Sequence, residues 1–447
     1  MRTLRPTTLA AILALAATAA AQPPPDAETA LRAFFAEPDA TRRESLARRF
    51  ADVAPPPWDK LTRLLRRAAS YPDLPPGLHR FTTPGDDDVP PVAYVLRVPP
   101  AYRAGDGRAW PLLVGCHGTG SSGEGFLARL LSILGPDADS FLLACPDAPE
   151  KGPYRAGRVS VLYPLRVLAD VRRRAAIDAD RASLTGYSKG GYATWGTALF
   201  YPGDWAAAVP MAGWPLTEAR SAGCTLYLEN LLGLAVQAHW GADDIVPRQT
   251  EGINTFNRQA AAELRRLGAS RFEAIEYPGQ RHALDVRSDK VRALLLSARR
   301  EPFPNRFRMT FHRIHQGRAP WARAVLAAGK PFDFDQRRVL RIRRPDQLDE
   351  ARRRLYRQEA MELGGQFAPD SNTLTLQARN LAEIEVDLSA ERLDFARPVR
   401  IVVNGRTVES ANREVDWAVL LETARETYDF QRLVAGRLRI PVRPGRR

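Results

Sequence analysis

The sequence predicts an α/β protein whose main sheet is mostly parallel, with a short helical prefix before it and a β-rich domain after it. From about residue 78, apolar strand patterns alternate with helical patterns, as in parallel sheets flanked by helices. A Gly-x-Ser-x-Gly pentapeptide stands between one of these strands and a helix. Beyond Pro302 and Pro304, short strand patterns predominate.

Size and composition limit the possible functions. The 447 residues suggest about three domains. Hydrophobic residues make up 45% of the chain and charged residues 26%, a composition that excludes wholesale disorder. The net charge of +14 comes from 60 Arg and 5 Lys spread along the chain, whereas a nucleic-acid binder concentrates its charge on one element. We expect no specific nucleic-acid partner, although the charge favours acidic surfaces or substrates. Three Cys are too few for a disulfide scaffold or a multi-cysteine zinc module, and no metal or organic cofactor is expected.

Residues 1–21 have the pattern of an export signal. Arg2 and Arg5 give a positive start, residues 9–21 form an apolar stretch, and three alanines at 19–21 offer a cleavage site before Gln22. This stretch is too short to span a bilayer, and no other apolar run reaches the roughly 18 residues required. The sequence therefore predicts a secreted or periplasmic protein without a membrane span.

Residues 22–77 are predicted to form a helical prefix and linker. A proline-rich segment, 22–25, is followed by apolar side chains at helical spacing. Three short helices are expected around Leu31, Phe34 and Phe35; around Leu46, Phe50 and Val53; and around Leu61, Leu64, Leu65 and Ala68.

Residues 78–301 are predicted to hold the mostly parallel sheet, and residues 302–447 a separate β-rich accessory domain. In the first, strands are expected at 92–98, 112–116, 141–145, 182–185, 207–211, 235–240 and 272–277, with helices at 192–200, 255–267 and 286–298. In the second, strands are expected at 307–311, 339–342, 372–378, 384–388, 399–403 and 438–442, with helices at 347–361 and 415–427. Asn404-Gly405 after residue 403 is a hairpin signal.

The pentapeptide Gly186-Tyr187-Ser188-Lys189-Gly190 carries the strongest chemical signal. Between a strand and a helix, such a turn holds the serine on a strained backbone and exposes its hydroxyl above the sheet. The strand entry at 183–185 and the helix at 192–200 supply this context. The alternative is a tight turn with a solvated serine.

A serine nucleophile needs a base and an acid that orients the base. In this setting the expected chain order is Ser, then Asp or Glu, then His. His282, in a loop after a strand, is the candidate base, whereas His239 lies within an apolar strand and is interpreted as a packed histidine. For the acid we favour Asp243, with Asp244 as the fallback.

A glycine-rich loop, residues 117–123, directly follows the strand at 112–116. Such a loop lets backbone N–H groups point at a developing oxyanion. The Thr119 amide and the Lys189 amide are the predicted oxyanion-hole donors. His117 is predicted to position the loop rather than to act as the base.

The same loop supports a rival hypothesis. Gly118, Gly120 and Gly123 match the Gly-x-Gly-x-x-Gly dinucleotide fingerprint, and Asp147 follows 24 residues after the last glycine. However, Pro146 separates Asp147 from the preceding strand. This hypothesis also leaves the serine, acid and histidine pattern unexplained.

Residues 111–118 (PLLVGCHG) and 178–191 (DADRASLTGYSKGG), with the continuation at 201–213, resemble the α/β-hydrolase superfamily. The chain is most similar to secreted esterases akin to feruloyl esterases and polyhydroxybutyrate depolymerases, often described as having a prolyl-oligopeptidase-like catalytic domain. The resemblance covers about residues 88–300. It implies Ser188 as nucleophile, His282 as base and Asp243 as acid, because in the family two residues commonly separate the acid from a Val-Pro pair. The Gly-Thr-Gly oxyanion loop and the neighbours of the serine depart from the family pattern and leave substrate choice open.

The sequence thus predicts an exported serine hydrolase that cleaves carboxylic esters, carbohydrate-linked esters among them. Tyr187 and Trp214 are candidate substrate-pocket residues, with core packing as the alternative. A serine peptidase of the prolyl-oligopeptidase-like type is the first alternative, although fewer than 80 residues precede the sheet, too few for a propeller. The second is a non-catalytic binding protein on a hydrolase scaffold, which a missing triad member would favour.

Overall fold

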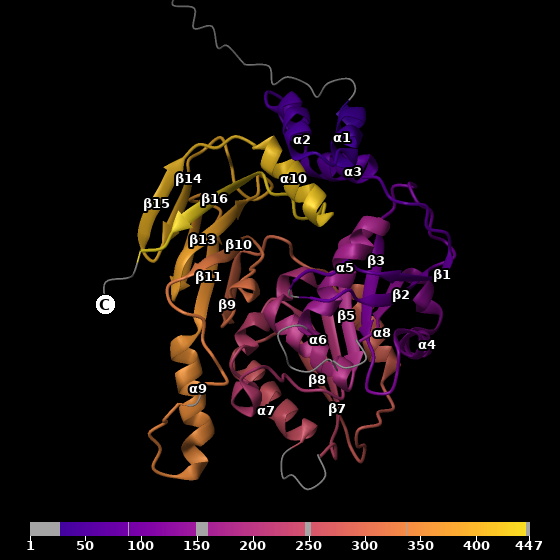
Figure 1. Ribbon diagram of the computed structural model, residues 1–447, viewed down its shortest axis with the longest axis vertical. Coiled ribbons are helices and arrows are strands. Elements are labelled where there is room, and N and C mark those ends of the chain that lie inside the picture. The colour runs from indigo at the N-terminus through magenta and orange to yellow at the C-terminus, as the bar shows by residue number, and fades with distance from the viewer. Residues whose placement is uncertain (1–26, 88, 149–159, 246–251, 337, 444–447) are drawn as a thin grey trace, which may run out of the picture.

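The computed structural model describes residues 27–87, 89–148, 160–245, 252–336 and 338–443. The predicted export signal lies outside these residues, so export stays a prediction. Along the chain follow three helices, an eight-stranded sheet with helices on both faces, and two smaller sheets (Figure 1). No helix in this described part of the chain is both long enough and apolar enough to cross a membrane.

The large sheet has the strand order β1-β2-β4-β3-β5-β6-β7-β8. Its strands are β1 (Gly77–Thr82), β2 (Ala93–Val98), β3 (Trp110–Cys116), β4 (Leu142–Pro146), β5 (Ile177–Tyr187), β6 (Ala207–Met211), β7 (Ala235–Gly241) and β8 (Phe272–Tyr277). Strands β1 and β2 pair antiparallel, whereas β3 to β8 run parallel to one another. This confirms the predicted mostly parallel sheet.

Helices cover both faces of the sheet. They are α4 (Gly123–Leu134), α5 (Tyr163–Arg174), α6 (Lys189–Phe200), α7 (Ile253–Arg266) and α8 (Ser288–Ser297). Successive strand residues point to opposite faces, so Leu113 packs with α4 and α8 while Leu112 and Val114 pack with α5, α6 and α7. Every residue of β3, β4, β6 and β7 is buried, which explains their continuous apolar pattern in the sequence.

The C-terminal part contains a five-stranded sheet, β15-β14-β12-β11-β9, and a three-stranded sheet, β10-β13-β16. The strands are β9 (Arg306–Phe311), β10 (Ala322–Ala327), β11 (Met361–Ala368), β12 (Thr373–Arg379), β13 (Leu381–Leu388), β14 (Val399–Val403), β15 (Arg406–Ala411) and β16 (Gly436–Pro441). Leu363 and Ile401 of the first sheet share a core with Ile384 of the second. The β-rich character is confirmed, and Asn404 and Gly405, with φ of 49° and 79°, form the predicted β14–β15 turn.

Three details of the C-terminal part differ from the prediction, the first being that strand β10 was not predicted. Residues 339–342, predicted as a strand, form an exposed loop, because their alternating pattern meets no strand of the described chain to pair with. The predicted helix at 347–361 is α9 (Leu348–Glu359). It ends before Ala360, whose backbone is extended, and the chain continues as β11, which was not predicted.

The helical prefix packs against the last helix of the chain. Its helices are α1 (Ala27–Ala36), α2 (Ala40–Ala47) and α3 (Trp58–Ala68), and Figure 1 shows them beside α10 (Trp417–Thr427). Helices α1 and α3 lie where they were predicted, whereas α2 contains Leu46 but ends before Phe50 and Val53. Phe34, Leu61 and Leu420 share one buried core. The Trp417 indole N–H also donates to the Val53 carbonyl at 2.9 Å. The prefix and the C-terminal part are therefore joined by a common core, and the domain boundaries stay predictions.

A buried ion network joins the α/β part to the segment after α10. The side chain of Arg300, only 2% exposed, lies 2.7 Å from Asp429 and 2.8 Å from Asp180. Burial alone raises the pKa of Asp429, but the charges of Arg300 and Arg172 outweigh that effect and hold the pKa well below its usual range. Removing one member of such a network leaves an uncompensated buried charge.

We expect Arg300→Met to lower the free energy of unfolding by about 3–5 kcal/mol near pH 7, because Asp429 then stays charged without its main partner. In the wild type the pairing stabilises the fold above the ordinary pKa of an aspartate and is lost as pH falls through the depressed value. In the variant Asp429 takes up a proton more readily, so the difference between the two proteins narrows in acid. Urea unfolding at pH 7 and pH 4 measures this difference.

Arg308→Met is the matched control, because Arg308 is 60% exposed and pairs with Glu229 at 3.0 Å. Exposed pairs contribute about 0–1 kcal/mol. Equal losses in the two variants would contradict the structural role of the Arg300 network.

Candidate active site

Ser188 stands on a strained turn between β5 and α6. Its φ of 56° and ψ of −117° are rare for residues with a side chain. The turn is tight because a Cβ at Gly186 would lie 2.3 Å from the Gly190 carbonyl oxygen, and one at Gly190 would lie 1.9 Å from the Cys116 carbonyl oxygen. The glycine spacing of the pentapeptide is thus a steric requirement of this fold.

Ser188, His282 and Asp244 form a continuous hydrogen-bonded chain. His282 lies in the loop after β8, with Nε2 at 2.8 Å from Ser188 Oγ and Nδ1 at 2.9 Å from Asp244 Oδ2. A carboxylate only accepts hydrogen bonds, so Nδ1 carries the proton and Nε2 of the neutral imidazole accepts from the serine hydroxyl. Asp244 is buried, whereas the His282 side chain is 48% exposed.

The preference for Asp243 as the partner of His282 is wrong. Asp243 is exposed, and its backbone N–H donates to the Gln280 carbonyl at 2.9 Å. The turn after β7, in which the Asp244 N–H donates to the Gly241 carbonyl at 3.2 Å, directs the second carboxylate inward. Adjacent residues point in different directions in such a turn, and no signal in the sequence distinguishes the two.

The glycine-rich loop after β3 lies against the serine turn. A Cβ at Gly118 would lie 3.2 Å from Ser188 Cβ, so the loop passes close beside the serine. His117 holds the loop: its Nδ1 lies 2.7 Å from the Gly118 carbonyl oxygen, and its Nε2 accepts from the Ala148 N–H at 3.0 Å. Thr119 follows Gly118 in this loop, and Lys189 follows Ser188 as the first residue of α6. Their roles as oxyanion-hole donors stay predictions.

The loop does not match a dinucleotide site in its hydrogen bonding. Asp147, the expected ribose-binding acid, accepts from the Gly123 N–H at 2.6 Å. The Ser122 hydroxyl accepts from the Gly125 N–H and caps α4. Asp147 is thus bonded to one of the first amides of α4, and the Ser122 hydroxyl is bonded to another. The acid that a ribose would need and the amides that a pyrophosphate would need already have partners within the loop.

Tyr187 fastens the loop that carries His282. Its hydroxyl donates to the His282 carbonyl and accepts from the Leu284 N–H at 3.1 Å. The guanidinium of Arg129 lies over its ring, 4.1 Å from the centroid. The structure thus places this predicted pocket residue as a brace behind His282.

Trp214 lies in an aromatic cluster next to the site. Its ring stacks on Phe256 at 4.2 Å and meets Tyr192 edge-on at 6.1 Å. Burial, and then the nearby charge of Asp244, raise the pKa of Tyr192 to about 12. Trp214 is 9% exposed, so packing accounts for most of its surface.

His239 is a packed histidine, as interpreted from the sequence. It is fully buried in β7 and lies 2.9 Å from both the Tyr277 hydroxyl and the Gln237 amide oxygen. Burial lowers its pKa to about 4, which keeps it neutral at physiological pH. Among the described residues, no cluster of three or more His, Cys, Asp or Glu side chains is suited to hold a metal ion.

No family model and no curated protein matches the chain. Several solved structures do. A thermostable esterase is 20% identical, with a TM-score of 0.38, over 50% of this chain and 63% of that one. A ferulic acid esterase is 14% identical, with a TM-score of 0.39, over 50% of this chain and 98% of that one. A putative dipeptidyl aminopeptidase IV from Bacteroides ovatus is 18% identical, with a TM-score of 0.38, over 50% of this chain and 36% of that one.

We expect Ser188→Gly to be more stable than Ser188→Ala by about 1–2 kcal/mol, because glycine relieves the strain of the positive φ. Thermal unfolding of the two variants measures the difference.

Ser132, exposed within α4, is the control position. There glycine should be less stable than alanine by about 1 kcal/mol. The same order of stability at both positions would contradict the strain assigned to Ser188.

Proposed function

We propose that the protein is a serine hydrolase that cleaves carboxylic esters by acyl transfer. The observation that carries the proposal is the hydrogen-bonded chain from the buried Asp244 through His282 to Ser188, with the serine on a strained turn. A serine hydroxyl is a weak nucleophile near neutral pH, and an adjacent oriented imidazole is what activates it. This arrangement supports the assignment of these three side chains as a catalytic triad.

The proposed reaction assigns one role to each side chain. Ser188 Oγ attacks the ester carbonyl while His282 Nε2 takes its proton, and His282 then gives that proton to the departing alkoxide. Water, activated by the same imidazole, hydrolyses the acyl-serine. Asp244 holds the Nδ1–H tautomer and stabilises the imidazolium that forms.

The backbone amides of Thr119 and Lys189 are proposed to stabilise the oxyanion. They belong to the loop and the helix that meet at Ser188, and the loop is held by His117. Losing one such donor typically costs about 100- to 1,000-fold in rate. This scheme uses no metal or organic cofactor.

Export to the periplasm or beyond is part of the proposal, on the pattern of residues 1–21. Esters attached to polysaccharides are the proposed natural substrates, on the resemblance at residues 111–118 and 178–191.

The test is hydrolysis of p-nitrophenyl esters of increasing acyl length by the wild type and by Ser188→Ala. Turnover that depends on Ser188 supports the esterase, and a maximum at short chains indicates a small acyl pocket. Turnover of peptidyl p-nitroanilides without turnover of esters would identify a serine peptidase instead. No turnover of either class, together with retained folding, would favour a binding protein on this scaffold.

Substitution of each of the two adjacent aspartates in turn tests which of them orients His282. We expect Asp244→Asn to lower kcat by about 10,000-fold, because the amide no longer holds the productive tautomer of His282. Asp243→Asn should leave kcat within about two-fold of the wild type, because its side chain is exposed and does not contact His282. Kinetics on one ester substrate measure both, and a large loss in Asp243→Asn alone would reverse the assignment.

Tyr187→Phe tests the brace behind His282. Without the hydroxyl, the loop loses its bonds to the His282 carbonyl and the Leu284 N–H, so we expect kcat to fall roughly 10- to 100-fold with little change in KM. Tyr94→Phe is the control, because it removes a hydroxyl bonded to Asp170 at another part of the sheet. An unchanged kcat in Tyr187→Phe would show that the loop does not need this brace.

A further inference from the structure

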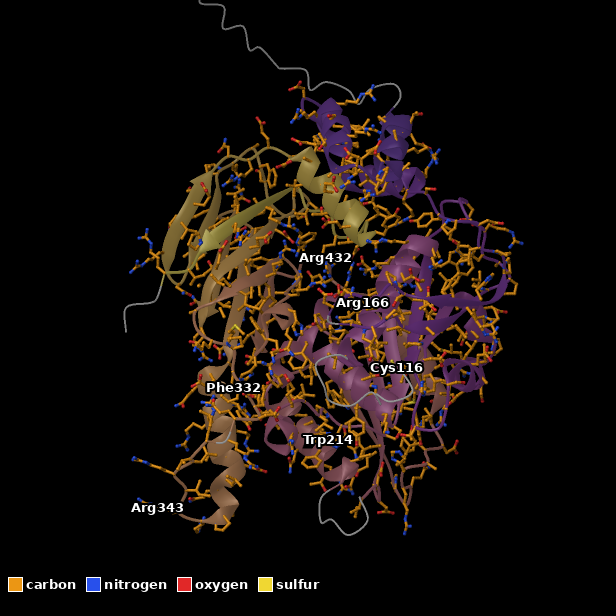
Figure 2. The ribbon with its side chains drawn as sticks, in the orientation of Figure 1. Cys116, Arg166, Trp214, Phe332, Arg343 and Arg432 are labelled. Carbon is orange, nitrogen blue, oxygen red and sulfur yellow. The ribbon has the colours of Figure 1, made fainter. Side chains whose placement is uncertain are left out.

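The loop before α9 contains an exposed segment of arginine and aliphatic residues, here called the basic tip (residues 338–344). Its sequence is RVLRIRR, and it holds no acidic residue. Arg338, Arg341, Arg343 and Arg344 are all exposed. Helix α9 and the loop before it form an arm, and Figure 2 shows Arg343 at the outer end of this arm, away from the sheets.

Two aliphatic side chains on the basic tip face solvent. Val339 is 98% exposed and Ile342 is 37% exposed. Neither side chain belongs to a hydrophobic core of the described residues. Burial of these two side chains against a partner surface would supply the free energy of apolar burial.

An aromatic cluster fixes the base of the arm. Phe332, Phe334 and Tyr356 lie with ring centroids 4.9–5.6 Å apart, and His312 of the C-terminal part joins them. Leu340 lines a cavity of about 600 Å³ together with Phe332, Phe334 and Tyr356. The loop is thus anchored on its inner side, which leaves Val339 and Ile342 on the outer side.

Part of the positive charge on the basic tip is uncompensated. Arg344 pairs with Asp346 at 3.1 Å, and Arg338 lies over the Phe332 ring at 4.4 Å. Arg341 and Arg343 form no ion pair with any residue that the structure describes. Two guanidinium groups are therefore available to an anionic partner next to the two aliphatic side chains.

We propose that the basic tip docks on a bilayer surface that contains anionic phospholipid. Arginines pair with lipid phosphates, and the aliphatic side chains enter the boundary between headgroups and acyl chains. A nucleic acid would use the arginines but would offer Val339 and Ile342 no apolar environment. A second copy of this tip would bring like charges together. This proposal is independent of the esterase proposal, because it concerns a different surface.

In Figure 1, α9 and the loop before it extend downward from the C-terminal sheets, with the loop at the lower left of the view. The exposed residues of the basic tip lie in that loop.

The experiment is co-sedimentation of the full mature chain with sucrose-loaded vesicles. Vesicles of phosphatidylglycerol and phosphatidylcholine in equal parts are compared with vesicles of phosphatidylcholine alone. We expect binding to the anionic vesicles only, with an affinity that falls as salt is added, because salt screens the arginine–phosphate attraction.

Two double variants separate charge from apolar insertion. Arg341→Gln/Arg343→Gln should lower the partition coefficient roughly 30-fold, and Val339→Ser/Ile342→Ser should lower it about 10-fold. Arg406→Gln/Val408→Ser on β15 makes the same kinds of change at exposed positions elsewhere and should bind like the wild type. Equal urea unfolding midpoints show that all variants stay folded.

Several results would overturn the proposal. These are no binding to anionic vesicles, equal binding to neutral vesicles, or an equal loss in the β15 variant. Wild-type vesicle binding by Val339→Ser/Ile342→Ser, together with tight binding of poly-uridylate by the wild type, would identify a polyanion site instead.

Discussion

The close contact between the start of α6 and the end of β3 is the constraint on which the candidate site depends. A single methyl group at Gly190 would collide with the Cys116 carbonyl oxygen, at 1.9 Å. Without a side chain at this position the helix approaches β3, and Ser188 is held beside the Gly118 loop. Strands β3 to β8 are parallel, so the loops after β7 and β8 emerge at the same edge of the sheet as Ser188. They approach Ser188 from the side of β5 opposite to β3.

The backbone of those two loops determines which side chains meet the serine. The Ala242 N–H donates to Tyr277 and the Asp243 N–H donates to Gln280, so the acid-bearing loop and the histidine-bearing loop are bonded together. Tyr187, next to the serine, is bonded to the His282 loop in turn. The positions of Ser188, His282 and Asp244 are thus set by main-chain bonds between the loops and by the hydroxyl of Tyr187.

Arginine side chains occur in two contrasting environments in this chain. Buried Arg300 neutralises Asp429 and Asp180 and joins two parts of the fold. On the basic tip, Arg341 and Arg343 are exposed and lie beside exposed aliphatic side chains. Among the described residues Arg300 is paired and Arg341 and Arg343 are not, because an unpaired charge is costly in the interior, whereas at the surface it is solvated.

Features that depend on local pattern could be predicted from the sequence. The apolar strands β3, β4, β6 and β7, the helices α7 and α10, the glycine spacing around Ser188 and the Asn404-Gly405 turn all express backbone sterics or side-chain periodicity, and each was predicted. Helices α4 and α5 and strands β1, β10 and β11 were not predicted. The choice of Asp244 over Asp243, the bracing contacts of Tyr187 and the unpaired loop at 339–342 were decided only by the tertiary structure. These depend on the direction of a turn, on a loop remote in sequence, and on whether a neighbouring strand is available. Short-range pattern carries no information about any of the three.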